Sequence, residues 1–314
     1  MSALQFSFEF FPPKGEKGAE RLATVRKQLA EVQPAFFSVT FGAGGSTQTG
    51  TLETCVDTLT DTGIPVAAHI SCIGSTRERI TELLGQYREA GIQRLVALRG
   101  DLLPGMTDPG EFRYANELVS FIRKTTGDEF HIEVAAYPEY HPESPTPEAD
   151  LQNLLRKIEA GADAVMTQYF YNAHAYEDLC NRLAAHGVTQ PVVPGVMPIT
   201  NYEQLIRFSD RCGAEIPRWI RRRLEAYGDD LDSLRAFGLD VVTQLSERLL
   251  ELGAPGLHFY TLNRAEHTLD LWRSLRLPMP ASAAAWRARR PFVHPERIVV
   301  HATPPDCQQV VKKR

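Results

Sequence analysis

The sequence predicts a single (β/α)8 barrel, and three features of the chain support this fold class. Short runs rich in β-branched and aromatic residues recur eight times, and amphipathic stretches that end near glycine or proline separate most of them. Eight alternating strands and helices are what a closed parallel barrel requires. The chain has 314 residues, which accommodates a barrel of about 250 residues and a tail.

The expected elements follow one another in regular order. The strands are predicted at Phe6–Phe10, Phe36–Thr40, Val66–Ile70, Arg94–Leu98, Ile132–Ala136, Ala164–Thr167, Val192–Val196 and Leu257–Phe259. Helices between them include Glu20–Val32, Arg77–Ala90, Asn116–Thr125 and Asp150–Ala160. An open doubly wound sheet is the alternative fold, but no Gly-x-Gly-x-x-Gly turn follows the first strand.

We predict that residues 1–277 form the barrel domain and that residues 278–314 form a C-terminal tail. The connection Pro198–Gly256 between the last two strands is too long for one helix, so we expect it to contain extra helices, among them Leu231–Leu252. The tail is rich in proline, alanine and arginine, which is typical of a flexible or loosely docked segment. Its short apolar run Ile298–Val300 is the part expected to dock.

The composition excludes several classes of protein. No window approaches the roughly 20 apolar residues of a membrane span, and the N-terminus lacks the features of a signal peptide, so we expect a cytoplasmic protein. The five cysteines are scattered without a Cys-x-x-Cys pair, which argues against disulfides and a structural zinc site. The net charge of -5 disfavours nucleic-acid binding.

The first strand carries the most informative polar residue. Alternation along Phe6–Phe10 places the phenylalanines on one face and Ser7 and Glu9 on the other. If the phenylalanines meet the helices, Glu9 points into the carboxyl end of the barrel, where barrel enzymes hold their reactive groups. A carboxyl group that is desolvated among aromatic rings has a raised pKa, which suits a general acid. A structural glutamate paired with a buried arginine is the equal alternative.

Other strand ends supply candidate ligand-binding groups. The third strand ends at His69 and the fourth at Arg99 and Asp101, which either face a ligand or form a salt bridge with each other. Gln168 ends the sixth strand, and its amide suits recognition of a heterocycle. Asn263, after the eighth strand, fits a ligand or the N-cap of a helix equally well. The first strand lacks the His-x-His pair of metal-dependent hydrolases and no strand contains a lysine for Schiff-base chemistry, so neither reaction class is expected.

Five motifs at these strand ends together resemble the bacterial methylenetetrahydrofolate reductases. They are Phe8–Pro13 (FEFFPP), Ala97–Asp101 (ALRGD), Ala135–Glu139 (AAYPE), Thr167–Phe170 (TQYF) and Phe259–Glu266 (FYTLNRAE). The resemblance implies an enzyme of one-carbon metabolism and methionine synthesis that uses FAD to reduce 5,10-methylenetetrahydrofolate to 5-methyltetrahydrofolate. It also implies NADH or NADPH as the electron donor, without choosing between them, and assembly into a homo-oligomer.

The same resemblance implies a site along the barrel mouth. For FAD it assigns Thr40, His69, Arg99, Gly100, Asp101, Tyr137, His141, Asp150, Asn153 and Lys157. For the folate and the nicotinamide it assigns Glu9, Gln168, Phe208, Tyr260 and Arg264. Because Asp150 opens the predicted helix, a positive helix end and Lys157 are expected together near the diphosphate.

The resemblance further implies catalytic roles for Glu9 and Asp101. The nicotinamide reduces the flavin and leaves, and the folate then takes the same site. Glu9 protonates N10 of the folate, which opens the five-membered ring to an iminium cation that Asp101 stabilises. Two alternatives are a flavin barrel of the proline dehydrogenase type and a non-catalytic flavin or folate carrier.

Overall fold

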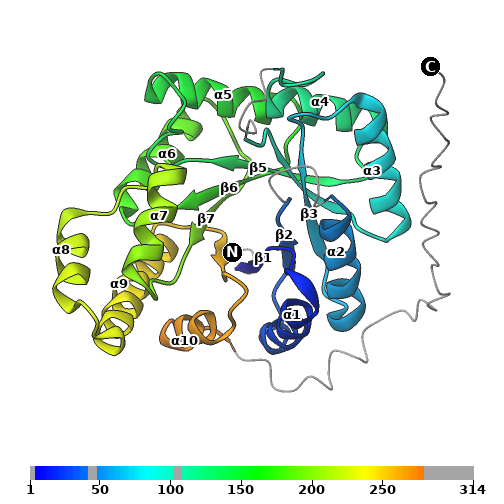
Figure 1. Cartoon of the computed structure of the whole chain (residues 1–314). Helices are drawn as coiled ribbons and strands as arrows, with labels where there is room; N and C mark the ends of the chain where they lie inside the picture. Colours follow the sequence, from blue (N-terminus) through cyan, green and yellow to red (C-terminus); the bar gives the residue numbers. More distant parts are fainter. Residues whose placement is uncertain (1–3, 42–47, 102–107, 279–314) are drawn as a thin grey trace, which may run out of the picture. The chain divides into compact units, whose positions relative to one another are not determined.

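A computed structural model of the chain describes residues 4–41, 48–101 and 108–278. Eight parallel strands form a closed barrel in the order β1 to β8, with helices around it (Figure 1). All eight predicted strands are confirmed, and the open doubly wound sheet is wrong. The strands are β1 Gln5–Phe10, β2 Phe36–Val39, β3 Val66–Ser71, β4 Arg94–Leu98, β5 His131–Ala136, β6 Ala164–Tyr169, β7 Val192–Val196 and β8 Gly256–Tyr260.

Helices follow the strands as predicted. They are α1 Gly15–Ala30, α2 Gln48–Thr62, α3 Arg77–Glu89, α4 Ala115–Thr126, α5 Pro147–Glu159, α6 Ala173–Ala185, α7 Tyr202–Cys212, α8 Arg218–Tyr227, α9 Leu231–Glu251 and α10 Glu266–Ser274. The α5 helix begins three residues before its predicted start. Thr146 caps it by accepting a hydrogen bond from the Ala149 N–H at 3.1 Å, and Pro147 suits the first helical turn.

The β1 strand shows how alternation positions the site. Phe6, Phe8 and Phe10 are buried on its outer face, and the Phe8 ring lies 5.3 Å from that of Phe259. Burying each of these rings stabilises the fold by about 2 to 3 kcal/mol. The same packing forces Ser7 and Glu9 into the barrel, as the sequence predicts.

The lower part of the barrel is filled with side chains. Phe36, Ala67, Val96 and Met166 form a small interior cluster. At the amino end of β4 the Arg94 guanidinium lies 4.3 Å from the centroid of the Phe36 ring and forms a 2.6 Å ion pair with Glu133. Because this end is closed by packed groups, the carboxyl ends of the strands form the mouth.

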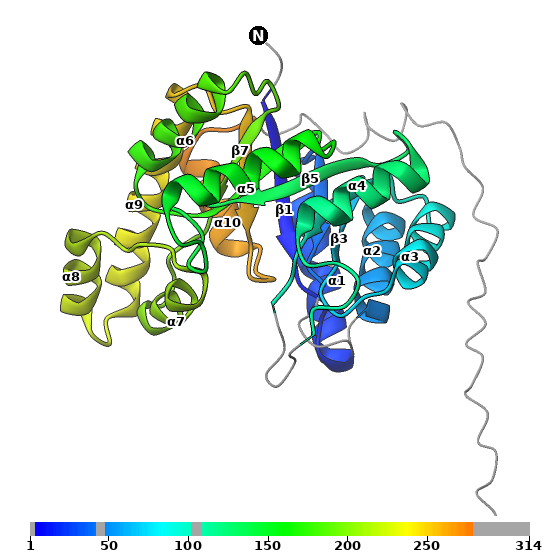
Figure 2. The ribbon, with the colours of Figure 1, turned by 90° about the horizontal axis from the view of Figure 1, so that it is seen from above.

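Three helices, α7, α8 and α9, occupy the long connection between β7 and β8, which confirms the prediction of extra helices there. Figure 2 shows α7 beside the barrel, toward the end at which β1 finishes. Asn201 caps α7 by accepting a hydrogen bond from the Gln204 N–H at 2.8 Å. The connection therefore brings a capped helix to the mouth.

The predicted tail, including Ile298–Val300, lies outside the described residues except for Pro278, so the boundary at 277 stays a prediction. In the described part of the chain no helix combines the length and hydrophobicity that crossing a membrane requires. The same residues contain no group of three His, Cys, Asp or Glu side chains arranged to hold a metal ion.

Candidate active site

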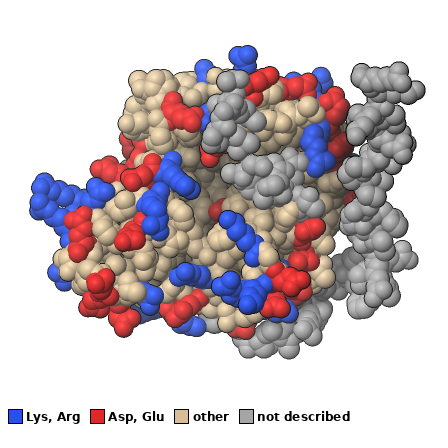
Figure 3. Space-filling view, in the orientation of Figure 1, with Lys and Arg blue, Asp and Glu red and all other residues tan. Residues whose placement is uncertain are grey.

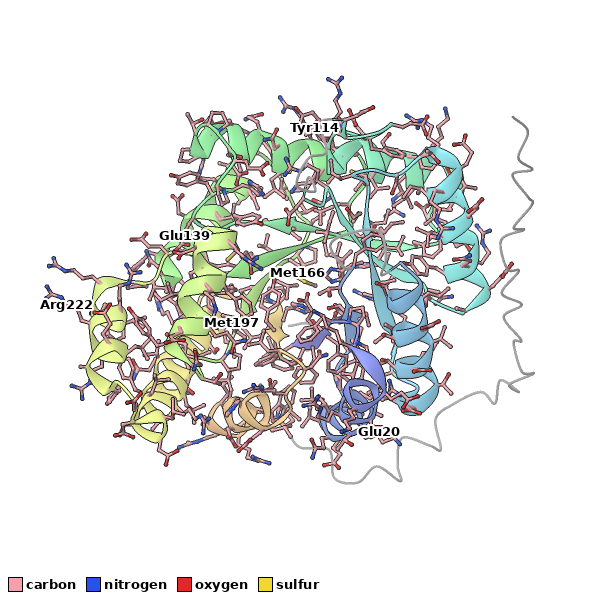
Figure 4. All side chains as sticks on the ribbon, viewed as in Figure 1. Glu20, Tyr114, Glu139, Met166, Met197 and Arg222 are labelled. Atoms are coloured by element: carbon pink, nitrogen blue, oxygen red, sulfur yellow. The ribbon has the colours of Figure 1, made fainter. Side chains whose placement is uncertain are left out.

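Two adjoining pockets open at the barrel mouth. The first, of about 250 Å³, is lined by Glu9, Thr40, Phe41, His69, Val96, Leu98, Ala135, Tyr137, Met166, Gln168 and Tyr260. The second, of about 170 Å³, is lined by Glu9, Phe10, Phe11, Gln168, Tyr169, Met197, Phe208, Tyr260, Thr261 and Leu262. Figure 4 shows Met166 and Met197, one from each lining, near the centre of the barrel. Glu9, Gln168 and Tyr260 belong to both linings and form the wall that the pockets share.

The Glu9 side chain points into the carboxyl end of the barrel, as predicted, and is only 15% exposed. Its Oε2 lies 3.4 Å from Nε2 of His69 on β3 and 3.5 Å from Nε2 of His258 on β8. The alternative of a buried arginine partner is therefore wrong, because the partners are two imidazoles. The predicted aromatic surroundings are found in the second pocket, where Phe208 and Tyr260 line the wall with Glu9.

His258 is a site residue that sequence reasoning missed. It is fully buried, and its Nδ1 lies 2.7 Å from the hydroxyl oxygen of Ser7. When the Ser7 hydroxyl donates to Nδ1, the ring proton sits on Nε2 and faces the Glu9 carboxyl group. Hydrogen bonds thus link Ser7 on β1 to His258 on β8 and His258 to Glu9 on β1. This network orients the Glu9 carboxyl group.

His69 is buried on the other side of Glu9. Burial lowers its pKa to about 4, although the Glu9 charge opposes this shift. The ring is therefore neutral at pH 7. Among the described residues, its Nδ1 has no hydrogen-bond partner. A buried polar atom without a partner destabilises a protein, and His69 lines the first pocket, where a ligand could supply that partner.

The buried His69 ring makes stability depend on pH. Its folded pKa of about 4 lies below the unfolded value of 6.5, so its contribution is present above pH 6.5 and is lost as the pH falls toward 4. The expected loss from His69 between pH 7 and pH 4.5 is about 2 kcal/mol. Urea unfolding of the wild type and His69→Gln at both pH values measures it. The same change at His174, whose side chain is 83% exposed, is the control; equal pH dependence in all three proteins would contradict the assignment.

Tyr260 is held in place by β6 and β7. Its hydroxyl donates to the Thr167 carbonyl at 2.8 Å, and the Thr167 hydroxyl accepts from the Gly195 N–H at 2.9 Å. A Cβ atom at position 195 would lie only 2.5 Å from the Tyr260 ring. Glycine at 195 therefore makes room for this tyrosine in the shared wall.

Asn263 and Thr261 join the ends of β8 and β1. The Asn263 amide donates to the Phe11 carbonyl at 2.8 Å and accepts from the Phe11 N–H at 3.0 Å. The Thr261 hydroxyl donates to the Glu9 carbonyl at 2.6 Å. Asn263 is thus not a helix N-cap, because the residue before α10 is Ala265. It fixes the backbone next to Glu9 instead.

The structure brings together four of the five residues that the resemblance assigns to substrate. Glu9, Gln168, Phe208 and Tyr260 all line the second pocket, and Phe208 reaches it from α7. Arg264 is exposed and lines a separate hollow. The roles of these residues stay predictions.

The residues assigned to FAD extend from the first pocket toward α5. Thr40, His69 and Tyr137 line that pocket. At the end of β4, Arg99 forms a 2.6 Å ion pair with Glu143, so a salt bridge between Arg99 and Asp101 is not the arrangement found. Gly100 has a φ of +84, and a Cβ there would lie 2.0 Å from the Ser71 hydroxyl, so this turn requires glycine.

The remaining FAD residues lie at α5, and one expectation about them is wrong. Asp150, in the first turn, accepts a hydrogen bond from the His141 N–H at 3.2 Å. Lys157 lies in the last turn, away from the positive helix end. Its ammonium group instead donates to the Ala135 carbonyl at 2.5 Å, and burial lowers its pKa to about 8. Asn153 is exposed and accepts from Arg156 at 2.7 Å.

These groups fit FAD. Arg99 and Lys157 supply two cations for a diphosphate, and a bound anion would share Arg99 with Glu143. The unpartnered Nδ1 of His69 supplies a polar contact within the pocket wall. The donor set therefore suits an anionic cofactor with a polar ring system.

A closed parallel barrel with a buried carboxyl group at its mouth belongs to the α/β-barrel enzymes. The family model "Methylenetetrahydrofolate reductase" matches residues 2–276. The chain therefore belongs to the methylenetetrahydrofolate reductase family of oxidoreductases, as the sequence motifs predict.

Curated relatives agree with this assignment. The chain is 34% identical to 5,10-methylenetetrahydrofolate reductase of Escherichia coli over 272 residues, which cover 87% of this chain and 90% of that protein. It is 38% identical to the enzyme of the same name from Pectobacterium carotovorum, over 87% and 90% of the two chains. A rice protein named probable methylenetetrahydrofolate reductase (NADH) is 37% identical, and the match covers 48% of its length.

Solved structures support the fold. A Clostridium thermocellum protein, described as binding two copies of 5-methyl-5,6,7,8-tetrahydrofolic acid, superposes with a TM-score of 0.61 at 15% identity, over 88% of this chain and 95% of that one. Oxaloacetate acetylhydrolase superposes with a TM-score of 0.51 at 10% identity, over 91% and 88% of the two chains. At these identities the likeness concerns the fold alone.

Proposed function

We propose that this protein reduces 5,10-methylenetetrahydrofolate to 5-methyltetrahydrofolate with NADH or NADPH and that it requires FAD. The observation that carries the proposal is the Glu9 carboxyl group, which lies in the wall shared by two mouth pockets, with its Oε2 3.4 Å from the His69 ring nitrogen and 3.5 Å from that of His258. Bound FAD would supply the two-electron transfer that the amino-acid side chains lack. In this proposal Arg99 and Lys157 hold its diphosphate, and Thr40, His69 and Tyr137 surround its ring system.

Glu9 would act as the general acid. A proton delivered to N10 of the folate breaks the bond between N10 and the one-carbon unit, and the positive charge moves to N5 as an iminium. The link from Ser7 through His258 keeps the carboxyl group aimed at the pocket. His69 is neutral at pH 7, so Glu9 is not held as a permanent ion pair with it.

Three further side chains would orient the folate. The Gln168 side chain lines both pockets, and its amide oxygen accepts from the Tyr169 N–H at 2.9 Å. The Gln168 side chain also forms a hydrogen bond with Tyr137, and the remaining N–H of its amide can donate to the pterin, which presents acceptor atoms at its edge. Phe208 and Tyr260 supply ring surfaces in the second pocket, and such surfaces stack on flat heterocycles.

Asp101 would stabilise the iminium cation. It follows Gly100 at the end of β4 and is exposed. The pKa of Tyr137 is raised mainly by burial, and the nearby Asp101 charge adds to this shift. Asp101→Asn is expected to weaken folate binding and to slow folate reduction roughly tenfold, because the charge opposite the cation is lost. Stopped-flow measurements on the reduced enzyme test this, and unchanged rates would contradict the role.

Steady-state turnover tests the proposed function. Under anaerobic conditions the holoenzyme should oxidise more than one equivalent of NADH or NADPH per FAD only when methylenetetrahydrofolate is present, and 5-methyltetrahydrofolate should then form in equal amount to the nicotinamide oxidised in turnover. Turnover with proline instead would support the proline dehydrogenase alternative, and a coloured protein that oxidises neither nicotinamide would support the carrier. Homo-oligomer assembly and cytoplasmic residence stay predictions from the sequence.

A further inference from the structure

Helix α7 buries two of its side chains, Leu205 and Ser209. Phe208, between them in the sequence, is half-buried and lines the second mouth pocket. Neighbouring residues of a helix point about 100° apart, so the direction of Ser209 sets the direction of Phe208. Figure 3 shows a hollow near the centre of the face on which the barrel mouth opens, and α7 lies to its left in the same orientation (Figure 1). A rotation of α7 about its axis would therefore move the Phe208 ring relative to the pocket.

Tyr169, at the end of β6, makes a buried polar contact with this helix. Its hydroxyl oxygen lies 3.1 Å from that of Ser209, and both residues are 5% exposed. Burial raises the pKa of the Tyr169 hydroxyl, so the group is protonated at pH 7. The Cys212 thiol, one turn further along α7, lies close to the same hydroxyl. Because a buried hydroxyl that loses its partner destabilises the protein, this hydrogen bond opposes rotation of the helix.

The end of β6 lets Tyr169 reach both α7 and the pocket. The pairing of β6 with β7 changes register between Met166 and Tyr169. Two consecutive residues, Gln168 and Tyr169, consequently line the second pocket, although strict alternation would turn one of them away. The centroid of the Tyr169 ring lies 6.2 Å from that of Tyr260, with the rings edge to face. Tyr169 thus contacts the wall of the pocket with its ring and α7 with its hydroxyl.

We propose that the hydrogen bond between Tyr169 and Ser209 positions α7 so that the Phe208 ring stays in the second pocket, a proposal that rests on the proposed function. In that function the Phe208 ring stacks on the pterin in one half-reaction and on the nicotinamide in the other. Because the two hydroxyl groups bond to each other, they act through this ring and not on the reacting atoms. The pair is therefore expected to govern the binding of both substrates more than the chemical step.

Tyr169→Phe and Ser209→Ala test the positioning role, because each removes one of the two hydroxyl groups. In either variant the Michaelis constant KM for methylenetetrahydrofolate and for NADH or NADPH should rise about two- to tenfold, the range that one hydrogen bond between neutral groups supplies. The turnover number kcat should stay within about twofold of the wild type. The double variant should raise KM no further, because both changes remove the same bond.

Hydrogen exchange of the α7 amides gives a second measurement that needs no substrate. In the FAD-loaded protein both single variants should exchange these amides faster than the wild type, because the helix has lost one of its two buried contacts. The amides of α3, on another side of the barrel, provide the internal reference and should exchange at the wild-type rate (Figure 1).

Tyr176→Phe is the matched control, since it removes another buried tyrosine hydroxyl. That hydroxyl donates to the Val192 carbonyl at 2.8 Å and joins α6 to β7, so α7 keeps its contact with Tyr169. This variant should be less stable than the wild type without a change in either KM. Unchanged KM values in Tyr169→Phe, or additive effects in the double variant, would overturn the positioning role and leave the proposed function intact. A wild type without folate turnover would refute the proposed function, and unchanged exchange of the α7 amides would overturn the anchoring of α7 separately.

Discussion

Glu9→Gln is expected to abolish folate reduction and to spare the oxidation of NADH or NADPH by the holoenzyme. Glutamine has the same shape and still reaches His69 and His258, but it has no acidic proton to give to N10. Loss of a general acid slows a reaction by about 10² to 10⁴-fold. Anaerobic rapid-reaction measurements of each half-reaction separate the two effects.

A glutamate outside the site provides the control for this prediction. Glu203 lies on α7, and its side chain is 83% exposed. Glu203→Gln should leave both half-reactions at wild-type rates. If Glu9→Gln slows both half-reactions equally, Glu9 acts in binding or structure and its role as the acid is wrong.

Gly195→Ala is expected to destabilise the protein by about 3 kcal/mol and to impair folate reduction. The added Cβ would lie 2.3 Å from the Thr167 carbonyl oxygen and 2.5 Å from the Tyr260 ring. The carbonyl oxygen cannot retreat easily, because the Tyr260 hydroxyl donates to it and the strands around it are packed. Tyr260 must therefore shift out of the shared wall. Urea unfolding measures the first effect, and KM for the folate measures the second.

Gly85→Ala makes the matched comparison. Gly85 lies inside α3, and a Cβ there meets no atom within 4 Å. Alanine favours helices over glycine by up to about 1 kcal/mol, so this variant should be slightly more stable than the wild type. Equal stability of the two variants would show that the space at Gly195 is not limiting.

The fold follows largely from patterns that are local in the sequence. Each strand is a short apolar run, and its bounds were predictable to within two residues because burial on the barrel requires such runs. Helix starts were less predictable. The residue before α1, Lys14, makes no side-chain cap bond, so no local signal marks that start. Thr146 and Pro147 do mark the start of α5, as a cap residue and a proline in the first turn.

The site was predictable only in part, because its residues meet through strand closure. Alternation along β1 placed Glu9 correctly. The same alternation points His258 inward, but only the pairing of β8 with β1, with Ser7 opposite His258, shows that it reaches Glu9. The hydrogen bond from Lys157 back to Ala135 depends on how α5 packs against β5, which leaves no pattern in the sequence.

The anaerobic absorbance spectrum of the FAD-loaded enzyme tests the central claim most directly. NADH or NADPH should bleach the flavin bands, and methylenetetrahydrofolate added afterwards should restore them with formation of one 5-methyltetrahydrofolate per flavin. Bands that neither nicotinamide bleaches, or that stay bleached after the folate is added, would contradict the account.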